Sequence, residues 1–420
     1  MKKPVKSNKW YLLIAVICVS LNLYSQNTGV TMKNIQFIEY PDFPDGNSTW
    51  GSIGYNPVNN NVYIGVTNHR DKIGFYEYDA DSDSIFLKGF IGQMAYLSDR
   101  NWQGKIHTKI VFDTLGNAYF GTDGGESRQE YLMNHPYGYA GGFIMKWNIA
   151  DGSLTNFGIQ FPYESIKDVD IDKSSGKIYA ISYPQVHFMI FNPKANNLKD
   201  FGRLGSDHVP RVNFTDQWGN CYYVDWRQRL VKYEKSKDKL LFAKESLPAF
   251  SGTPGTHIIT GITAFAKDKI NNVIYMVTYG AKVLAFYPVE EGIGRVDDLG
   301  AVYDLPDSIL WQPYVPNLNI GANGKLYYFI GGHENYVKGD TSVLMEFDPQ
   351  TKKKKVLMEF PTREISEVTG SDITDNDGNM YFAGRKIRPK EPDEVEGLPS
   401  IDDNVSLPFL IKFNPEKIIR

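Results

Sequence analysis

Histidine, tyrosine and arginine side chains that could move a proton occur where predicted strands begin or end. His107 and Arg211 precede hydrophobic strands, and Tyr183 follows one. A guanidinium binds a carboxylate through two hydrogen bonds and withdraws its charge. An imidazole or a phenol can then remove a proton from the adjacent carbon and protonate the leaving oxygen. The chemistry that these residue types indicate is β-elimination at a uronate, which requires no cofactor.

A sevenfold internal repeat supplies the elements that would position these side chains. In each repeat a turn rich in Gly, Asn or Asp precedes a hydrophobic strand with a tyrosine. The tyrosines are Tyr63, Tyr119, Tyr179, Tyr222, Tyr275, Tyr327 and Tyr381. A period near fifty residues, built from strands and tight turns, is typical of a β-propeller blade. We therefore predict an all-β fold, a seven-bladed β-propeller, in a single domain that covers residues 26–420.

Each repeat predicts a blade of four strands, which we call A to D from the axis outward. The chain ends at Arg420, soon after a predicted strand C, so the last blade lacks its outer strand. Residues 33–40 alternate as a strand should, and we expect this N-terminal strand to close the last blade. Such closure removes an open sheet edge.

Long loops are expected on one face of the ring, where strands A begin and strands B end. The segments 121–142, 331–341 and 385–407 are the longest B–C loops. Long loops on a rigid scaffold usually carry function. For substrate binding on this face we predict His208, Arg203, Tyr279, Trp226 and His333.

A metal site is a further hypothesis. His187, His208 and His257 could meet across adjacent blades and hold a structural zinc, although none has standard zinc spacing. Cys221 occupies a repeat position that is otherwise apolar, so we expect it in the core. The chain has no Gly-x-Ser-x-Gly elbow, no phosphate-binding Gly-Lys loop and no His-Glu-x-x-His motif.

The N-terminus predicts export. Residues 1–25 have the features of a signal peptide: four lysines, then the apolar run 11–21, then Ser25 before Gln26. We expect a secreted or periplasmic monomer that is not attached to a membrane after cleavage. The net charge is −4 and the isoelectric point about 6.0, without a basic stripe, so nucleic acid is not an expected partner.

The segments 104–122 and 139–143 resemble exported propeller-fold polysaccharide lyases, as do 181–188, 201–203 and 208–211. The chain is similar there to the seven-bladed ulvan lyases, which act on a sulfated, uronate-containing algal polysaccharide. The resemblance covers about residues 100–225. It implies an anionic polysaccharide as substrate, His107 and Tyr183 as acid and base, and Arg211 as the group that neutralises the uronate. A structural zinc is also implied.

Two other functions stay open, because propellers serve many roles. A non-catalytic propeller could bind a glycan or a protein on the long-loop face. It would use an aromatic platform such as Trp102, Trp226 and Trp311, without a proton-transfer set. The other alternative is a lyase for a cyclic peptide antibiotic, an activity that also occurs on seven-bladed propellers.

Overall fold

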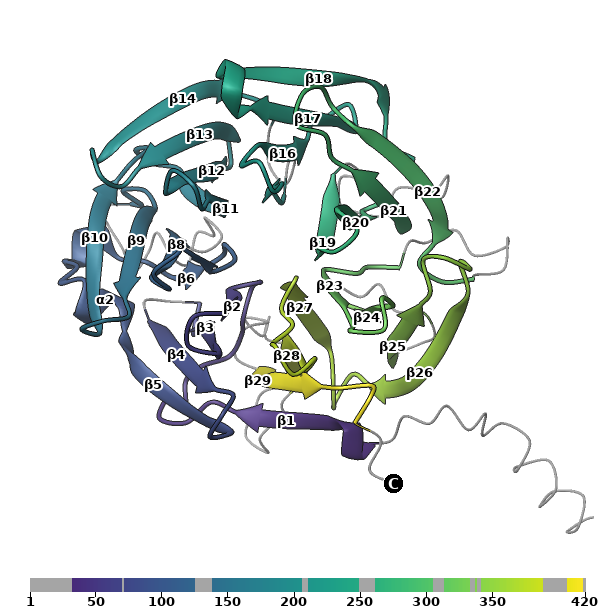
Figure 1. Cartoon of the computed structure of the whole chain (residues 1–420). Helices are drawn as coiled ribbons and strands as arrows, with labels where there is room; N and C mark the ends of the chain where they lie inside the picture. Colours follow the sequence, from purple (N-terminus) through teal and green to yellow (C-terminus); the bar gives the residue numbers. More distant parts are fainter. Residues whose placement is uncertain are drawn as a thin grey trace, which may run out of the picture.

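The computed structural model describes residues 32–69, 72–124, 138–205, 211–248, 261–304, 313–332, 337, 341–387 and 406–417. Its sheets stand radially around one axis, and the earliest strand of each separate sheet is innermost (Figure 1). The fold is an all-β propeller, and its sheets are consistent with six or seven blades. None of the helices within these ranges is long and apolar enough to cross a membrane.

Five sheets are separate from one another. The first contains β2 (Ile53–Asn56), β3 (Asn61–Thr67), β4 (Ile73–Asp79) and β5 (Ser84–Phe90). The second contains β6 (Lys105–Ile106), β7 (Val111–Phe112), β8 (Ala118–Asp123), β9 (Phe143–Asn148) and β10 (Ser153–Ile159). The third contains β11 (Ser165–Asp172), β12 (Lys177–Tyr183), β13 (His187–Asn192) and β14 (Asn197–Arg203). The fourth contains β15 (Phe214–Thr215), β16 (Cys221–Val224), β17 (Arg229–Glu234) and β18 (Lys239–Ser246). The fifth contains β19 (Ile262–Asp268), β20 (Val273–Thr278), β21 (Lys282–Tyr287) and β22 (Arg295–Ala301).

The sixth sheet has eight strands and joins the two ends of the described chain. One half contains β23 (Asn317–Ile320), β24 (Leu326–Ile330), β25 (Thr341–Phe347) and β26 (Lys354–Pro361). The other contains β27 (Glu367–Ser371), β28 (Met380–Ile387), β29 (Ser406–Phe413) and β1 (Ile35–Glu39). A short parallel pairing of β23 with β27 connects the halves. β1 pairs antiparallel with β29, so the predicted closure by the N-terminal strand is confirmed.

A buried phenol explains why the turn and the tyrosine recur together. Asp375 accepts hydrogen bonds from the Asn379 side chain at 2.7 Å and from the Tyr381 hydroxyl at 2.8 Å. Asp216 makes the same two bonds, each 2.9 Å long, to Asn220 and Tyr222. A hydroxyl that is buried in a core requires such a partner. In these two repeats the turn therefore supplies the acceptor for the tyrosine that follows it, whereas Tyr63 and Tyr327 donate to glutamates of the next strand.

Carboxylates of β11 bind the exposed edge of the next inner strand. The Asp168 carboxylate accepts the backbone N–H of Asn213 at 2.9 Å, and that of Asp170 accepts the N–H of Thr215 at 2.8 Å. An innermost strand has no partner strand on its axial side, so these N–H groups would otherwise be unpaired. The two aspartates thus join the third sheet to the fourth.

Lysines from two other sheets neutralise these carboxylates. The Lys109 ammonium bonds to Asp168 and, at 2.7 Å, to the carbonyl of Asn213. The Lys267 ammonium lies 3.3 Å from Asp170. Burial opposes ionisation of Asp170, but the charges of Lys267 and Lys109 and the N–H donors outweigh it and lower its pKa. We call Lys109, Asp168, Asp170 and Lys267 the axial charge cluster.

We expect Asp170→Ala to lower the free energy of unfolding by about 3–5 kcal/mol, because it leaves a buried lysine uncompensated. Urea denaturation would measure the loss. The matched control is Asp297→Ala, which breaks an exposed pair with Arg295 and should cost at most about 1 kcal/mol. Equal effects of the two substitutions would contradict a structural role for the axial charge cluster.

Candidate functional site

Three inner strands are irregular where they pass one cavity on the axis. Residues 107–110 separate β6 from β7, and the pairing register shifts at Lys167 in β11 and at Thr263 in β19. His107, Lys167 and Thr263 all line this cavity. Bulges turn a side chain out of its regular alternation and are frequent beside functional sites. Here they direct polar side chains toward the axis.

The interruption at His107 has a local cause. The Thr108 hydroxyl accepts the backbone N–H of Gly121 at 3.0 Å, and so replaces a bond that a regular strand would make to β8. Gly121 must be a glycine, because a Cβ atom there would lie 2.3 Å from Ile166. The backbone N–H of Ile110 bonds instead to Ile53 of the first sheet.

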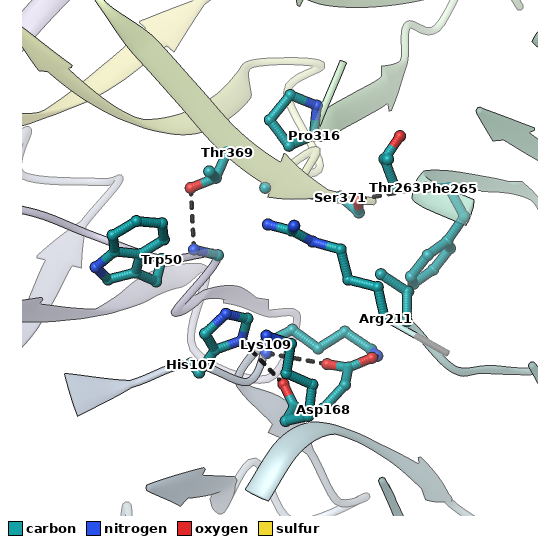
Figure 2. A pocket seen from close by; sticks show the side chains of 14 residues that line it. Trp50, His107, Lys109, Asp168, Arg211, Thr263, Phe265, Pro316, Thr369 and Ser371 are labelled. Carbon is teal, nitrogen blue, oxygen red and sulfur yellow. Dashed lines mark hydrogen bonds and ion pairs between the residues drawn. The ribbon is translucent and has the colours of Figure 1, made fainter. Parts of the chain in front are cut away.

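Arg211 occupies the middle of the cavity. Figure 2 shows its side chain extending between His107 on one side and Thr369 and Ser371 on the other. Lys109, Phe265 and Ser371 line this cavity and also a second one on the opposite side, so they form a floor between the two. We call the cavity that contains His107 and Arg211 the upper cavity.

The His107 imidazole has the protonation state that a base requires. Its side chain is largely buried, with 9% of the residue exposed, and its Nδ1 lies 3.1 Å from the carbonyl of Lys167. A carbonyl only accepts hydrogen bonds, so Nδ1 carries the hydrogen and Nε2 is the acceptor. Burial, together with the positive charges of Lys167, Lys105 and Arg211, holds the His107 pKa well below 6.5. The ring is therefore neutral at pH 7.

Two tyrosines hold the Arg211 guanidinium. Its Nη1 donates to the Tyr279 hydroxyl at 2.6 Å, and its central carbon lies 5.8 Å and 5.6 Å from the ring centroids of Tyr279 and Tyr314. Arg211 forms no ion pair with any residue that the structure describes. A partly buried guanidinium without a carboxylate partner among the described residues favours an anionic ligand. Tyr279, predicted from the sequence as a substrate-binding residue, thus contacts the cavity arginine directly.

Tyr183 lies beside the upper cavity rather than in its lining. It ends β12 and is half-buried, and the Lys167 ammonium lies 4.6 Å from its ring centroid. Lys167 therefore contacts both predicted proton carriers, since its carbonyl binds His107 and its ammonium covers Tyr183. The structure brings His107 and Arg211 into one cavity. Tyr183 does not line this cavity but contacts Lys167, which does.

The remaining substrate-binding predictions are dispersed. Arg203 ends the outermost strand β14 and donates to the carbonyl of Gly205, so it does not reach the upper cavity. Trp226 follows β16 and is 58% exposed, with the Arg227 guanidinium 4.7 Å from its ring centroid. His208 and His333 lie outside the described residues.

The predicted zinc ligands do not form a described cluster. His187 begins β13, where its Nδ1 lies 3.0 Å from Asp200 and its ring packs on Phe161. His208 and His257 lie outside the described residues. Within the described ranges, no three His, Cys, Asp or Glu side chains are grouped to hold a metal ion. Cys221 is fully buried, which confirms its prediction as a core residue.

Several cavity residues were missed in the sequence, although one signal would have found them. Five residues that line the upper cavity each stand twelve positions before a repeat tyrosine. They are Gly51, His107, Lys167, Thr263 and Thr369. This single repeat position therefore forms much of the cavity wall. Lys167 was missed, although it stands at the same repeat position as His107.

Trp50 precedes this position by one residue and was also missed. It lines the cavity, and two cations contact its ring. The Lys105 ammonium is 4.8 Å from the ring centroid, and the Arg385 guanidinium is 5.2 Å from it. The His107 ring stacks on Trp50 at 6.3 Å between centroids. Both cations can interact with the face of the indole ring, and Arg385 is also paired with Glu367 at 2.6 Å.

No family model matches the chain, and no curated protein matches it. Solved structures do. A virginiamycin B lyase from Staphylococcus aureus matches with a TM-score of 0.54 and 10% identity, over 90% of this chain and 98% of that one. The WD40 repeats of RRP9 match with a TM-score of 0.54 and 8% identity, over 91% of this chain and 97% of that one. The structure of U3-55K matches with a TM-score of 0.54 and 9% identity, over 91% of this chain and 98% of that one. At these identities the likeness establishes a shared β-propeller fold.

Proposed function

We propose that this protein is an exported polysaccharide lyase that cleaves a uronate-containing, ulvan-like polysaccharide by β-elimination. The observation that carries the proposal is the presence of Arg211 and a neutral His107 in one cavity. The guanidinium suits a uronate carboxylate, and the imidazole suits the removal of the proton beside it. The cations Lys105 and Lys167 around them favour an anionic substrate.

The proposed reaction transfers one proton in each direction. His107 Nε2 removes the proton from the carbon next to the carboxylate, while Arg211 stabilises the negative charge that develops. The electron pair forms a double bond to the next carbon, and the bond from that carbon to the glycosidic oxygen breaks. The Tyr183 hydroxyl donates its proton to the leaving oxygen. The reaction consumes no water and requires no cofactor.

We also propose that the propeller has seven blades and that the protein is exported. Each half of the eight-stranded sheet has the four-strand order of the separate sheets, which supports a count of seven blades. Residues 1–25 would be removed on export to the periplasm or the medium, and the mature protein would act as a monomer. A structural zinc held by His187, His208 and His257 remains a hypothesis.

We expect the purified mature protein to release unsaturated uronate ends, which absorb in the ultraviolet, from ulvan, pectic or other uronate polymers. Arg211→Lys keeps the charge but loses the bidentate geometry, and should lower kcat/KM by about 10- to 100-fold. The matched control Arg295→Lys, on the outer strand β22, should leave it unchanged. Absence of product from all of these polymers would exclude the proposed substrate class.

The pH dependence tests the role of His107. Because its pKa is lowered, the base form persists as the pH falls through 6.5, so the acidic limb of kcat/KM should lie well below pH 6.5. His107→Gln should lower kcat by at least about 100-fold. A titration of the His107 ring by NMR provides a check that does not depend on activity. A midpoint at or above 6.5 would contradict the proposed base.

A second candidate, a non-catalytic glycan-binding propeller, is favoured by the exposed Trp226 with Arg227 over its ring. The predicted platform is otherwise not supported, because Trp102 is buried and donates to the carbonyl of Gly138. Trp311 lies outside the described residues. This candidate predicts that glycan affinity, measured by calorimetry, falls in Trp226→Ala and stays unchanged in His107→Ala, with no unsaturated product from the wild type.

A further inference from the structure

A buried histidine that the proposed reaction does not use lies next to Trp50. His69 follows β3 and is 3% exposed, and its φ of 57° is a left-handed value that His, Asn and Asp adopt more readily than most residues. Its backbone N–H donates to the Thr67 hydroxyl at 2.7 Å, and that hydroxyl donates to the carbonyl of Gly104. Because Gly104 precedes His107 by three residues, the turn that carries His69 is fixed to the segment that carries the proposed base.

The hydrogen bonds of the His69 ring determine its protonation state. The Trp50 indole Nε1 donates to His69 Nε2, and an indole N–H can only donate. His69 Nε2 must therefore carry a lone pair, so the hydrogen of the neutral ring is on Nδ1. This nitrogen lies 2.8 Å from Asn47 Oδ1, which accepts the hydrogen. The Asn47 amide is oriented in turn, because its Nδ2 donates to the carbonyl of Asn68 at 3.2 Å.

The indole ring that His69 holds packs against the proposed base. Trp50 and His107 both line the upper cavity, with 15° between their ring planes and 6.3 Å between the centroids (Figure 2). The backbone beside Trp50 is also held, since the Gly51 N–H donates to the Thr369 hydroxyl at 3.0 Å. His107 Nδ1 is bound to the carbonyl of Lys167. A hydrogen bond at one edge and a stacked face together restrict the direction in which His107 Nε2 points.

We propose that Trp50 and His69 are positioning residues of the lyase: His69 holds the Trp50 indole, and the indole holds the His107 imidazole where Nε2 can remove the substrate proton. This inference rests on the proposed role of His107 as the base. Neither positioning residue transfers a proton, because the His69 lone pair is occupied by the indole N–H and the indole has no acceptor. A displacement of a catalytic group by about 1 Å can lower a rate by about 100-fold. The first sheet thus supports a base that the second sheet carries.

NMR spectra of the mature protein without substrate test these contacts. Two-bond proton–nitrogen correlations show which ring nitrogen carries the hydrogen, and we expect Nδ1 for His69. The Trp50 indole N–H signal, assigned by its absence from Trp50→Phe, should move upfield in His69→Asn, which loses the acceptor but tolerates the left-handed backbone. The His107 ring signals should move in both variants. A hydrogen on His69 Nε2, or His107 signals that neither substitution changes, would overturn the proposal.

Kinetics on a uronate polymer test the consequence for catalysis. Trp50→Phe keeps an aromatic ring but loses the indole donor, and should lower kcat by about tenfold with KM changed by less than about twofold. His69→Asn should lower kcat by a similar factor. His69→Gln has an amide oxygen that can accept the indole N–H, and should keep kcat within about threefold of the wild type. The matched control is Trp218→Phe, in the turn between β15 and β16, which should leave kcat unchanged.

The outcomes separate this proposal from the proposed function. An unchanged kcat in His69→Asn, a loss confined to KM, or an equal loss in Trp218→Phe would refute the positioning role. Equal losses in His69→Gln and His69→Asn would refute the role of His69 as acceptor. A wild-type protein that releases no unsaturated product would instead contradict the lyase, and the His107 ring signals would still show whether Trp50 and His69 hold that ring.

Discussion

The whole ring depends on how its innermost strands satisfy their axial backbone groups. An inner strand has a partner on one side only, and its other edge faces the axis. Asp168 and Asp170 close this edge between the third and fourth sheets, and Lys109 and Lys267 bring the charges of the second and fifth sheets to the same place. Ser371 and Asp372 bind the N–H groups of β19 in the same way. Side chains thus add polar links between sheets whose inner strands also pack against one another.

This arrangement also divides the axis into two chambers of different chemistry. Above the axial charge cluster, bulges turn His107, Lys167 and Thr263 inward, and Arg211 is held by two tyrosines. Below it, tight turns form a wider chamber that both lysines and aspartates line. The carboxylates of the cluster already accept hydrogen bonds from backbone N–H groups and are paired with lysines. The arginine of the upper chamber is consequently left without a carboxylate partner among the described residues.

The propeller fold could be predicted from the sequence because each repeat contains a tyrosine whose buried hydroxyl needs a nearby hydrogen-bond acceptor. Most of the repeat tyrosines donate to an acceptor in the preceding turn or in the next strand, and this pattern is visible without any knowledge of packing. Tyr179 instead donates to a carbonyl in the turn of the next sheet. The site was predicted in part. His107 and Arg211 share a cavity because the inner-strand segments of the second and fourth sheets converge on the axis. The contact of Arg211 with Tyr279, and the place of Lys167 between His107 and Tyr183, arise from bulges and from pairing across sheets, which no local pattern reveals.

The pairing of β1 with β29 has a consequence for biosynthesis. The first strand of the ring stays without its partner until the last strand has left the ribosome. Ring closure is therefore the final folding event, and its loop-closure entropy involves almost the entire polypeptide. Until then both strand edges are open to a neighbouring copy, and an exchange of the first strand between two molecules would yield a domain-swapped dimer.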